Sequence, residues 1–554
     1  MQEFDTGCSI LGFREHIFTG SVSSVANYMA LQELSFVTLG QRVLNQPLRI
    51  RQHYGHPDVF DKVFIMTEGG MSKASRGINL SEDVFAGFNA TIRGHTVNFV
   101  EYAQVGKGRD VGLQQTYKFE AKLSQGNAEQ SISRDMARIC DRLDFFRLLS
   151  FYYGGIGHYM ANTMVMFTLI VVVYTMLGLA IYGEEGVNGR KMHPEGVLQL
   201  LLSGMGILQT LPLYVTLTVE KGFVGASSEI AYMMLSGGPL YFIFHIQTKC
   251  YYFQQTLLAG GAMYRPTGRG FVTRHSPFDE NYRFFASSHI YLAFELMVAL
   301  VLLALYTTST QYGGLTWSLW MTVVSFLLGP FWFNPVTFEL SKVQEDYVLW
   351  LRWMQETGGS AEQSWEIWWR EENGFFAGLS PSWKVLLLVQ KTAVWLFLGA
   401  GLLGGRFLRD SGEHWRVVEL LLIFIGYALG SWVIGRMEHS ATYAVRRLAS
   451  IALSSGVVGV VVYLFATHTL YIKYAVALYY SAAALCFVAL VCGSQAVAHV
   501  YKMHDYLVGH TIFFLLGILS TLQVDPPLPL PLLFLFLLLP YLGSLSPFFS
   551  CRPL

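Results

Sequence analysis

The sequence predicts a membrane protein in which a partial, cytosolic α/β domain precedes an α-helical transmembrane bundle of about 8–10 spans. The chain is 53% hydrophobic, 15% aromatic and only 14% charged, which is too apolar for a soluble protein. Its charges are unevenly placed, since residues 1–160 hold 16 basic and 16 acidic side chains out of 38 of each kind. Beyond them, apolar runs long enough to cross a bilayer recur up to residue 524.

The charge balance and the cysteines exclude several classes of protein. The formal net charge is zero, so we expect no nucleic-acid partner. None of the six cysteines forms a CxxC pair, and therefore neither a disulfide framework nor a zinc site is expected. The chain opens on an acidic stretch without a signal peptide. The leading domain is therefore expected to stay in the cytosol, with the first span acting as an internal anchor.

The leading domain, residues 1–160, mixes turn signals with short apolar runs. The runs at 59–66 and 97–100 predict strands or buried segments, and 83–93 and 130–147 predict helices. This mixture indicates an α/β domain.

The rest of the chain divides according to its apolar runs. We expect a first transmembrane pair in 161–220, a cytosolic or interfacial segment in 221–288, a bundle in 289–524 and a low-complexity Pro/Leu/Phe tail in 525–554. Basic residues in the loops predict that 221–288 and 341–384 face the cytosol, the latter as an aromatic element on the lipid headgroups. A shorter run at 231–248, which carries His245, predicts an interfacial or re-entrant segment. The individual span candidates are 163–182, 196–219, 289–308, 314–333, 385–405, 420–435, 448–471, 474–497 and 506–524.

A carboxylate pair, Glu82 and Asp83, follows Ser81. One interpretation is a helix start, with Ser81 as the N-cap and the two carboxylates favoured by the helix dipole. The other is a general base that takes a proton from an attacking sugar hydroxyl. The triplet alone leaves both interpretations open.

A glycine-spaced cationic loop follows, in which Lys107, Arg109 and Asp110 alternate with glycines. Two cations at this spacing can face one anion, which suits a diphosphate leaving group whose charge grows as its bond breaks. An exposed hairpin turn with a local ion pair is the alternative.

Other polar clusters are less specific. The basic loop 68–77 can hold phosphate or connect two elements, and HYGHPD at 53–58 indicates a turn rather than a metal site. The polar run 126–135 predicts a helix start or an acceptor-binding motif, and 264–273 a basic turn. Glu295 and Lys391 fall within predicted spans, where ionisable groups line a path, snorkel or pair.

Several of these strings occur in one order, and this order is more specific than any of them alone. Together they resemble the 1,3-β-glucan synthase family, which includes the callose synthases and forms glycosyltransferase family 48, in its C-terminal portion. The strings are HYGHPD at 53–58, GGMSK at 69–73, SEDVFAG at 81–87, EY at 101–102, QVGKGRD at 104–110, EQ at 129–130, SR at 133–134, FYY at 151–153 and GRGF at 268–271.

The resemblance implies a processive transfer of glucose from UDP-glucose to a growing 1,3-β-glucan, with inversion, in a GT-A-like domain. It implies Asp83 as the base beside Glu82, with Lys73, Lys107, Arg109 and Asp110 around the donor. Gln130 and Arg134 are matched to an acceptor motif at the mouth of the exit path. It further implies a multi-pass plasma-membrane protein that exports the polymer through its spans and is regulated by a Rho-type GTPase. No residue is assigned as a metal ligand, and whether the reaction uses a divalent cation such as Mg²⁺ is left open.

Two alternatives come from other classes. A transporter or channel with a cytosolic regulatory domain is suggested by Glu295 and Lys391, although no inverted repeat is visible. A non-catalytic scaffold or fragment derived from a synthase is suggested by the expectation that the chain lacks the upstream half of the transferase domain.

Overall fold

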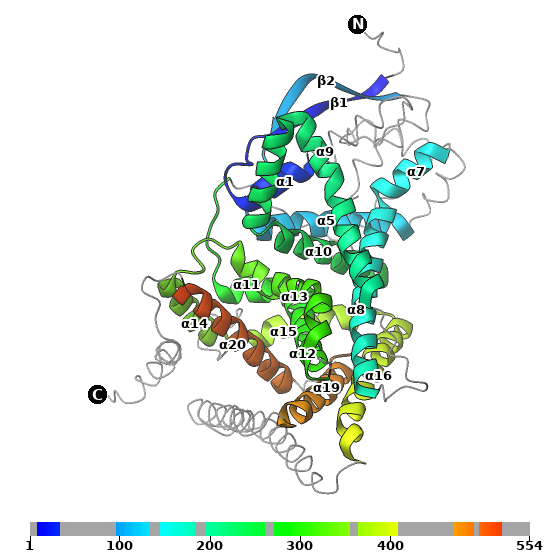
Figure 1. The fold of residues 1–554 in the computed structure, drawn as a ribbon, viewed down its shortest axis with the longest axis vertical. Coiled ribbons are helices and arrows are strands. Elements are labelled where there is room, and N and C mark those ends of the chain that lie inside the picture. The colour runs from blue at the N-terminus through cyan, green and yellow to red at the C-terminus, as the bar shows by residue number, and fades with distance from the viewer. Residues whose placement is uncertain are drawn as a thin grey trace. The chain divides into compact units, whose positions relative to one another are not determined.

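The computed structural model of the chain divides into two compact units, and each is described by itself (Figure 1). Unit 1 comprises residues 1–170, 193–274 and 324–335, and unit 2 comprises 171–192, 275–323 and 336–554. The structure describes residues 8–33, 96–132, 145–182, 195–260, 271–306, 309–354, 364–407, 470–491 and 498–522.

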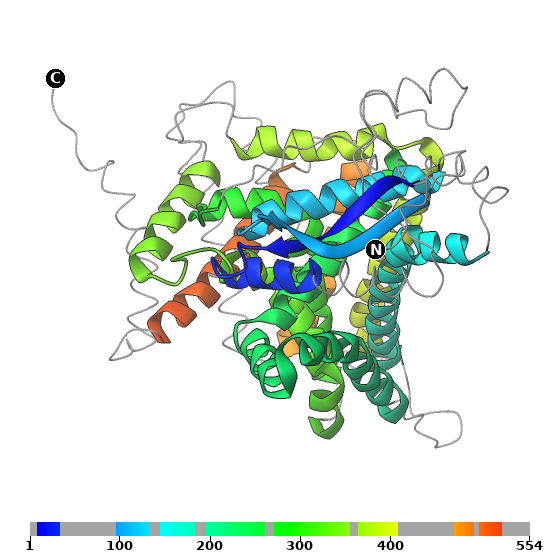
Figure 2. The ribbon, with the colours of Figure 1, turned by 90° about the horizontal axis from the view of Figure 1, so that it is seen from above.

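Unit 1 contains two parallel strands, β1 (Cys8–Ile17) and β2 (Thr96–Lys107), which run side by side in Figure 2. The register pairs Cys8 with Thr96 and Ile17 with Lys107, with an irregularity between Phe13 and Arg14. The strand expected at 97–100 is confirmed and is longer than predicted. The predicted strand at 59–66 and helix at 83–93 lie outside the described residues. The described part of unit 1 thus bears out a small parallel sheet among helices.

The helices of unit 1 begin with α1 (Ser24–Glu33), which the hydroxyl of Ser23 caps by accepting a hydrogen bond from Ala26 N at 3.0 Å. The chain continues through α5 (Leu113–Ile132), α7 (Phe145–Gly154) and the first half of α8 (Ile156–Tyr182). After them come α9 (Glu195–Leu235), kinked at Gly222 with φ 75°, and α10 (Gly238–Ala259).

The polar run 126–135, expected to open a helix, instead ends one, because 126–132 forms the last part of α5. Its polar residues are of the types found at helix starts, but here their side chains form hydrogen bonds to backbone carbonyls of the same helix. Asn127 Nδ2 donates to the carbonyl of Leu123 at 2.9 Å, and Ser131 Oγ donates to that of Asn127 at 2.7 Å. Of the predicted helix at 130–147, residues 130–132 lie in α5 and 145–147 in α7, and 133–144 are outside the described residues.

Helices α5, α8 and α10 pack against one another in unit 1. Ala128 of α5, Tyr159 of α8 and Phe253 of α10 form a buried cluster in which the two rings stack with centroids 5.6 Å apart. The run expected as one interfacial segment at 231–248 is divided between the end of α9 and α10. Tyr241 and His245 of α10 are buried inside unit 1, so this part of the run is a core helix.

Within its described residues, the regular elements of unit 2 are all helical, joined by short turns. Its elements are the second half of α8, α11 (Phe278–Phe285), a π turn (Ala286–Ile290), α12 (Tyr291–Tyr306), the first part of α13 (Ser309–Trp332), α14 (Leu340–Met354), α15 (Trp365–Gly378), α16 (Pro381–Phe407), α19 (Leu470–Val491) and α20 (Ala498–Leu522).

Three helical stretches of the described chain are long and apolar enough to cross a membrane: Ile156–Gly178, Phe278–Leu305 and Pro381–Leu402. They coincide with the spans predicted at 163–182, 289–308 and 385–405. The runs predicted at 196–219, 314–333, 474–497 and 506–524 lie largely within α9, α13, α19 and α20. The candidates 420–435 and 448–471 and the tail 525–554 lie outside the described residues.

The tryptophans of the 341–384 loop were expected on lipid headgroups, and this is wrong for most of them. Trp350 and Trp365 are at most 1% exposed, and Trp353 and Trp369 are also buried. Trp350 packs against α20, where Gly509 leaves room for its ring, since a Cβ there would overlap the indole. The loop contributes to the core of unit 2 because α14 and α15 find apolar partners far along the chain.

Candidate functional site

The two parallel strands of unit 1 end at the same edge, where the loops that follow them are bonded together. Thr19 Oγ1 accepts from Arg109 N at 2.9 Å and lies 3.2 Å from Arg109 O. Ser23 Oγ donates to Val111 O at 2.7 Å. The cationic loop 107–111 therefore has a fixed backbone at the carboxyl edge of the strands, where ligands commonly bind in α/β proteins.

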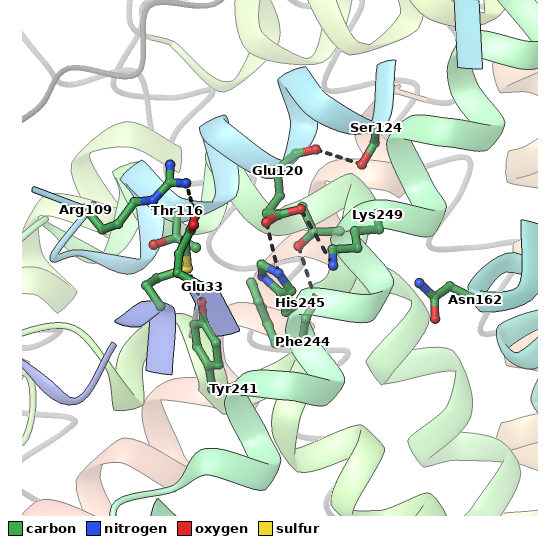
Figure 3. Close-up of polar contacts among 12 residues, drawn as sticks. Glu33, Arg109, Thr116, Glu120, Ser124, Asn162, Tyr241, Phe244, His245 and Lys249 are labelled. Carbon is green, nitrogen blue, oxygen red and sulfur yellow. Dashed lines mark hydrogen bonds and ion pairs between the residues drawn. The ribbon is translucent and has the colours of Figure 1, made fainter. Parts of the chain in front are cut away.

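Each cation of this loop is paired with a carboxylate of unit 1. Lys107 Nζ lies 2.7 and 2.8 Å from the two carboxylate oxygens of Glu15, across the strand pair. The Arg109 guanidinium pairs with Glu33 at the end of α1 (Figure 3). It also lies 4.9 Å over the ring of Phe119. The strands are parallel, so the loop is not the hairpin turn of the alternative interpretation. An anionic ligand at either cation would have to displace a carboxylate.

Gly108 is required by packing rather than by its backbone angle. A Cβ at this position would overlap Cε1 of Phe271 and lie 3.2 Å from Cζ of Phe18. The two rings are themselves in contact, with centroids 5.6 Å apart. The glycine therefore lets two aromatic rings close over the loop between the cations.

The remaining predicted site residues are only partly within the described chain. Asp110 is buried beside the loop, and Gln130 is buried near the other end of α5. Since α5 begins at Leu113, just after the loop, Gln130 lies about 26 Å along the helix from that end. The loop and Gln130 are thus too far apart to contact the same sugar. Lys73, Glu82, Asp83 and Arg134 lie outside the described residues.

A buried ionic cluster that the sequence analysis missed joins α5 to α10, as Figure 3 shows, and extends to α8. Glu120 Oε1 lies 3.1 Å from His245 Nε2, and Glu120 Oε2 lies 3.8 Å from Lys249 Nζ. Lys249 Nζ also lies 3.3 Å from His158 Nε2, which contacts the Asn162 side-chain nitrogen at 3.2 Å. One signal could have found it, because His245 and Lys249 are four residues apart and so share a face of α10.

The electrostatics of this cluster favour an ionised carboxylate. Burial alone would raise the pKa of Glu120, but the charge of Lys249 and the contact with His245 lower it to about 2. Burial lowers the pKa of His245, and Lys249 adds to this effect while Glu120 opposes it. Near neutral pH the Glu120 carboxylate is therefore ionised and lies beside an uncharged His245 imidazole and Lys249.

The same residues do not form a metal site. In the parts of the chain that the structure describes, no group of three or more His, Cys, Asp or Glu side chains is arranged to hold a metal ion. Glu120 and His245 offer only two ligands, and Lys249 occupies the space beside them. The cluster is suited to fixing helices rather than to binding a cation.

Comparison with known proteins matches most of the chain to a known protein family. The family described as 1,3-beta-glucan synthase component matches residues 1–384. The chain is 46% identical over 404 residues to callose synthase 5 of Arabidopsis thaliana, which covers 68% of this chain and 21% of that protein. It is 42% identical over 454 residues to callose synthase 3 of the same plant, covering 78% and 23%. The chain thus spans about a fifth of these relatives, and no solved structure matches it.

Proposed function

Because the chain belongs to the 1,3-beta-glucan synthase component family, we propose that it takes part in making 1,3-β-D-glucan from UDP-glucose at a membrane. The observation that carries this is the 46% identity to a callose synthase over two thirds of the chain. The three candidate spans support a membrane site of action. The chain spans only about a fifth of its relatives. The enzymatic activity, the substrate and the partners of this chain are therefore proposed here rather than established.

The proposed reaction is an inverting transfer by a GT-A-like domain. Asp83 takes the proton of the acceptor's 3-hydroxyl, whose oxygen forms a bond to the anomeric carbon of glucose. The bond from that carbon to the diphosphate oxygen breaks, and UDP leaves with the electron pair. Glu82 lies beside the base, and Lys73 and Asp110 belong to the donor side of the pocket. Gln130 and Arg134 bind the growing polymer. This role is consistent with the distance along α5 between Gln130 and the cationic loop, because a polymer can extend over several sugars.

The two cations of the loop are suited to different tasks. The Lys107 side chain is 29% exposed and its carboxylate partner Glu15 is equally accessible, so an incoming diphosphate can replace Glu15 there. The Arg109 side chain is 12% exposed and is held by both Glu33 and Phe119. We therefore assign direct contact with the diphosphate to Lys107, while Arg109 contributes its charge from a fixed position.

Further parts of the proposal concern the setting of the enzyme. The protein is a multi-pass plasma-membrane protein with residues 1–160 in the cytosol, and its spans pass the growing glucan outward. A Rho-type GTPase regulates it. A divalent cation such as Mg²⁺, if bound, would offset the negative charge of the diphosphate, and we assign no residue of the chain to it. The resemblance to the family motivates these statements, and the apolar helices support only the membrane part.

Incorporation of radiolabelled UDP-glucose into insoluble glucan by membranes that contain the chain tests the proposal. Asp83→Asn should abolish incorporation, and Lys107→Ala should weaken turnover by about 2–4 kcal/mol, as loss of one electrostatic donor does. Lys221→Ala is a matched control, because this lysine of unit 1 also pairs with a carboxylate, Glu229, at 2.7 Å. Wild-type incorporation by Asp83→Asn contradicts the assigned base. A folded wild-type chain that incorporates nothing indicates a non-catalytic fragment.

A further inference from the structure

The buried cluster around Glu120 lies midway along the helix that connects the two proposed substrate contacts. Asp110 precedes Glu120 by ten positions, and Gln130 follows it by ten. A helix rises 1.5 Å per residue, so Gln130 lies about 15 Å from Glu120 along α5. On the other side the helix begins at Leu113, about 10 Å from Glu120, and Asp110 lies just before it. A shift of α5 at Glu120 would therefore be transmitted to both ends of the helix.

Aromatic packing and charge both connect α5 to α10 around Glu120. Tyr117 of α5 and Tyr252 of α10 are buried and pack edge to face with centroids 5.4 Å apart. Beside Glu120 the α5 side chains Ala121 and Ser124 are small and fully buried, and small residues do little to fix how far one helix slides or rotates against another. The buried ionic contacts of Glu120 with His245 and Lys249, at 3.1 and 3.8 Å, add an attraction between the helices at this level.

The same cluster reaches the first candidate span. Lys249 lies between Glu120 of α5 and His158 of α8, at 3.8 and 3.3 Å from their side chains. His158 is in the first turn of α8, which begins at Ile156 and continues as an apolar helix to Tyr182. Three helices that are separate in sequence are thus connected through one ammonium group.

We propose that Glu120 is a positioning residue, which through Lys249 fixes α5 against α10 and the start of the first span and so places the Lys107–Asp110 loop for the donor. This inference rests on the proposed function, because the loop is a donor site only if the chain uses UDP-glucose. Glu120 is not proposed to touch substrate, since it is 2% exposed.

A charge-removal cycle tests the coupling. Glu120→Gln and Lys249→Met each leave one buried charge without its partner, whereas the double variant removes both charges. We expect each single variant to raise the KM for UDP-glucose about tenfold, and the double variant to return within about threefold of wild type. Amides of α5 should exchange with deuterium about tenfold faster in the single variants and recover in the double variant.

Two further variants separate positioning from general stability. Glu120→Asp keeps the charge on a shorter side chain and should give an intermediate KM. The exposed pair Lys342 and Glu345 on α14, 2.5 Å apart, is a matched control whose neutralisation should change neither KM nor exchange. A merely structural role would lower the amount of active protein and leave KM unchanged.

The outcomes are distinct. Unchanged KM and exchange in Glu120→Gln overturn the proposal, and so does a double variant no better than the worse single variant. If the wild-type chain incorporates no glucose, the proposed function fails by itself. In that case hydrogen exchange of α5 alone still decides whether Glu120 and Lys249 fix this helix.

Discussion

Unit 1 and unit 2 each bury a carboxylate, and they stabilise it in different ways. Glu120 in unit 1 faces an ammonium group and an imidazole of α10. Asp505 in unit 2 is completely buried and accepts hydrogen bonds from neutral groups. The hydroxyls of Tyr282 and Tyr291 donate to Oδ1 at 2.9 and 2.8 Å, and the indole of Trp365 donates to Oδ2 at 2.7 Å.

This difference determines what a substitution leaves behind. Removing either member of a buried ion pair leaves an uncompensated charge, so both members are equally sensitive. Removing an acceptor shared by neutral donors leaves several unsatisfied donors, whereas removing one donor costs little. The Glu120 site thus depends on charge balance, whereas Asp505 of α20 is one acceptor shared by donors from α11, α12 and α15.

The largest effect should follow from Asp505→Leu. This change leaves three buried donors without an acceptor and should reduce the free energy of unfolding by about 3–6 kcal/mol. Thermal unfolding of the detergent-solubilised chain, followed by tryptophan fluorescence, would measure it. Asp505→Asn, which keeps one acceptor oxygen, should cost clearly less. Equal losses in the two variants would mean that charge, not acceptor capacity, matters at this position.

Acidification should loosen unit 1 through its ion pair. The pKa of Glu120 in the folded chain is about 2, below its ordinary value of 4.5, so its stabilising contribution is complete above pH 4.5 and decreases as the pH falls toward 2. The shift corresponds to about 3 kcal/mol. The lowered pKa of His245 acts in the same direction, because folding opposes its protonation. Hydrogen exchange of α5 and α10 between pH 6 and pH 3 would measure this, and Glu120→Gln should flatten the response.

The smallest expected change in stability concerns Glu295, whose partners include both a charged lysine and neutral hydrogen-bond donors. Its carboxylate lies 3.1 Å from Lys391 Nζ and also contacts the hydroxyl of Tyr174 and the indole of Trp395. Glu295→Gln should therefore cost about 2 kcal/mol, and Lys391→Met clearly less, because the neutral donors remain and this lysine is partly exposed. The midpoint of thermal unfolding would compare them. If Lys391→Met lowered the midpoint more than Glu295→Gln does, Glu295 would depend mainly on charge balance, as Glu120 does.

Features that depend on local sequence were predicted well. The strand at 97–100 follows from its alternating apolar residues, and the three candidate spans follow from apolar length. Pairing was one of the three outcomes expected for Glu295 and Lys391, and the structure shows it. The order of the motifs indicated the family that the comparisons confirm. Each of these depends on neighbouring residues or on a long, ordered pattern.

Features that depend on distant contacts were missed. The partners of Glu120 come from α10, far along the chain, and nothing near Glu120 marks it as buried. The carboxylates that neutralise Lys107 and Arg109 lie in β1 and α1, so the loop appeared more cationic in sequence than it is in the fold. The polar run at the end of α5 was interpreted as a possible helix start for a related reason. Local polarity alone does not show whether polar residues begin a helix or lie in its last turns.

The parallel pairing of β1 with β2 has a consequence for synthesis of the protein on the ribosome. The strands are joined by residues 18–95, so the pairing of β1 with β2 cannot form until β2, which ends at Lys107, has emerged. At a translation rate of about 5–20 residues per second, this delay is roughly 4–18 s. During that interval the nascent β1 lacks β2 as its neighbour, and chaperone occupancy measured on stalled nascent chains should fall once stalling is moved beyond β2.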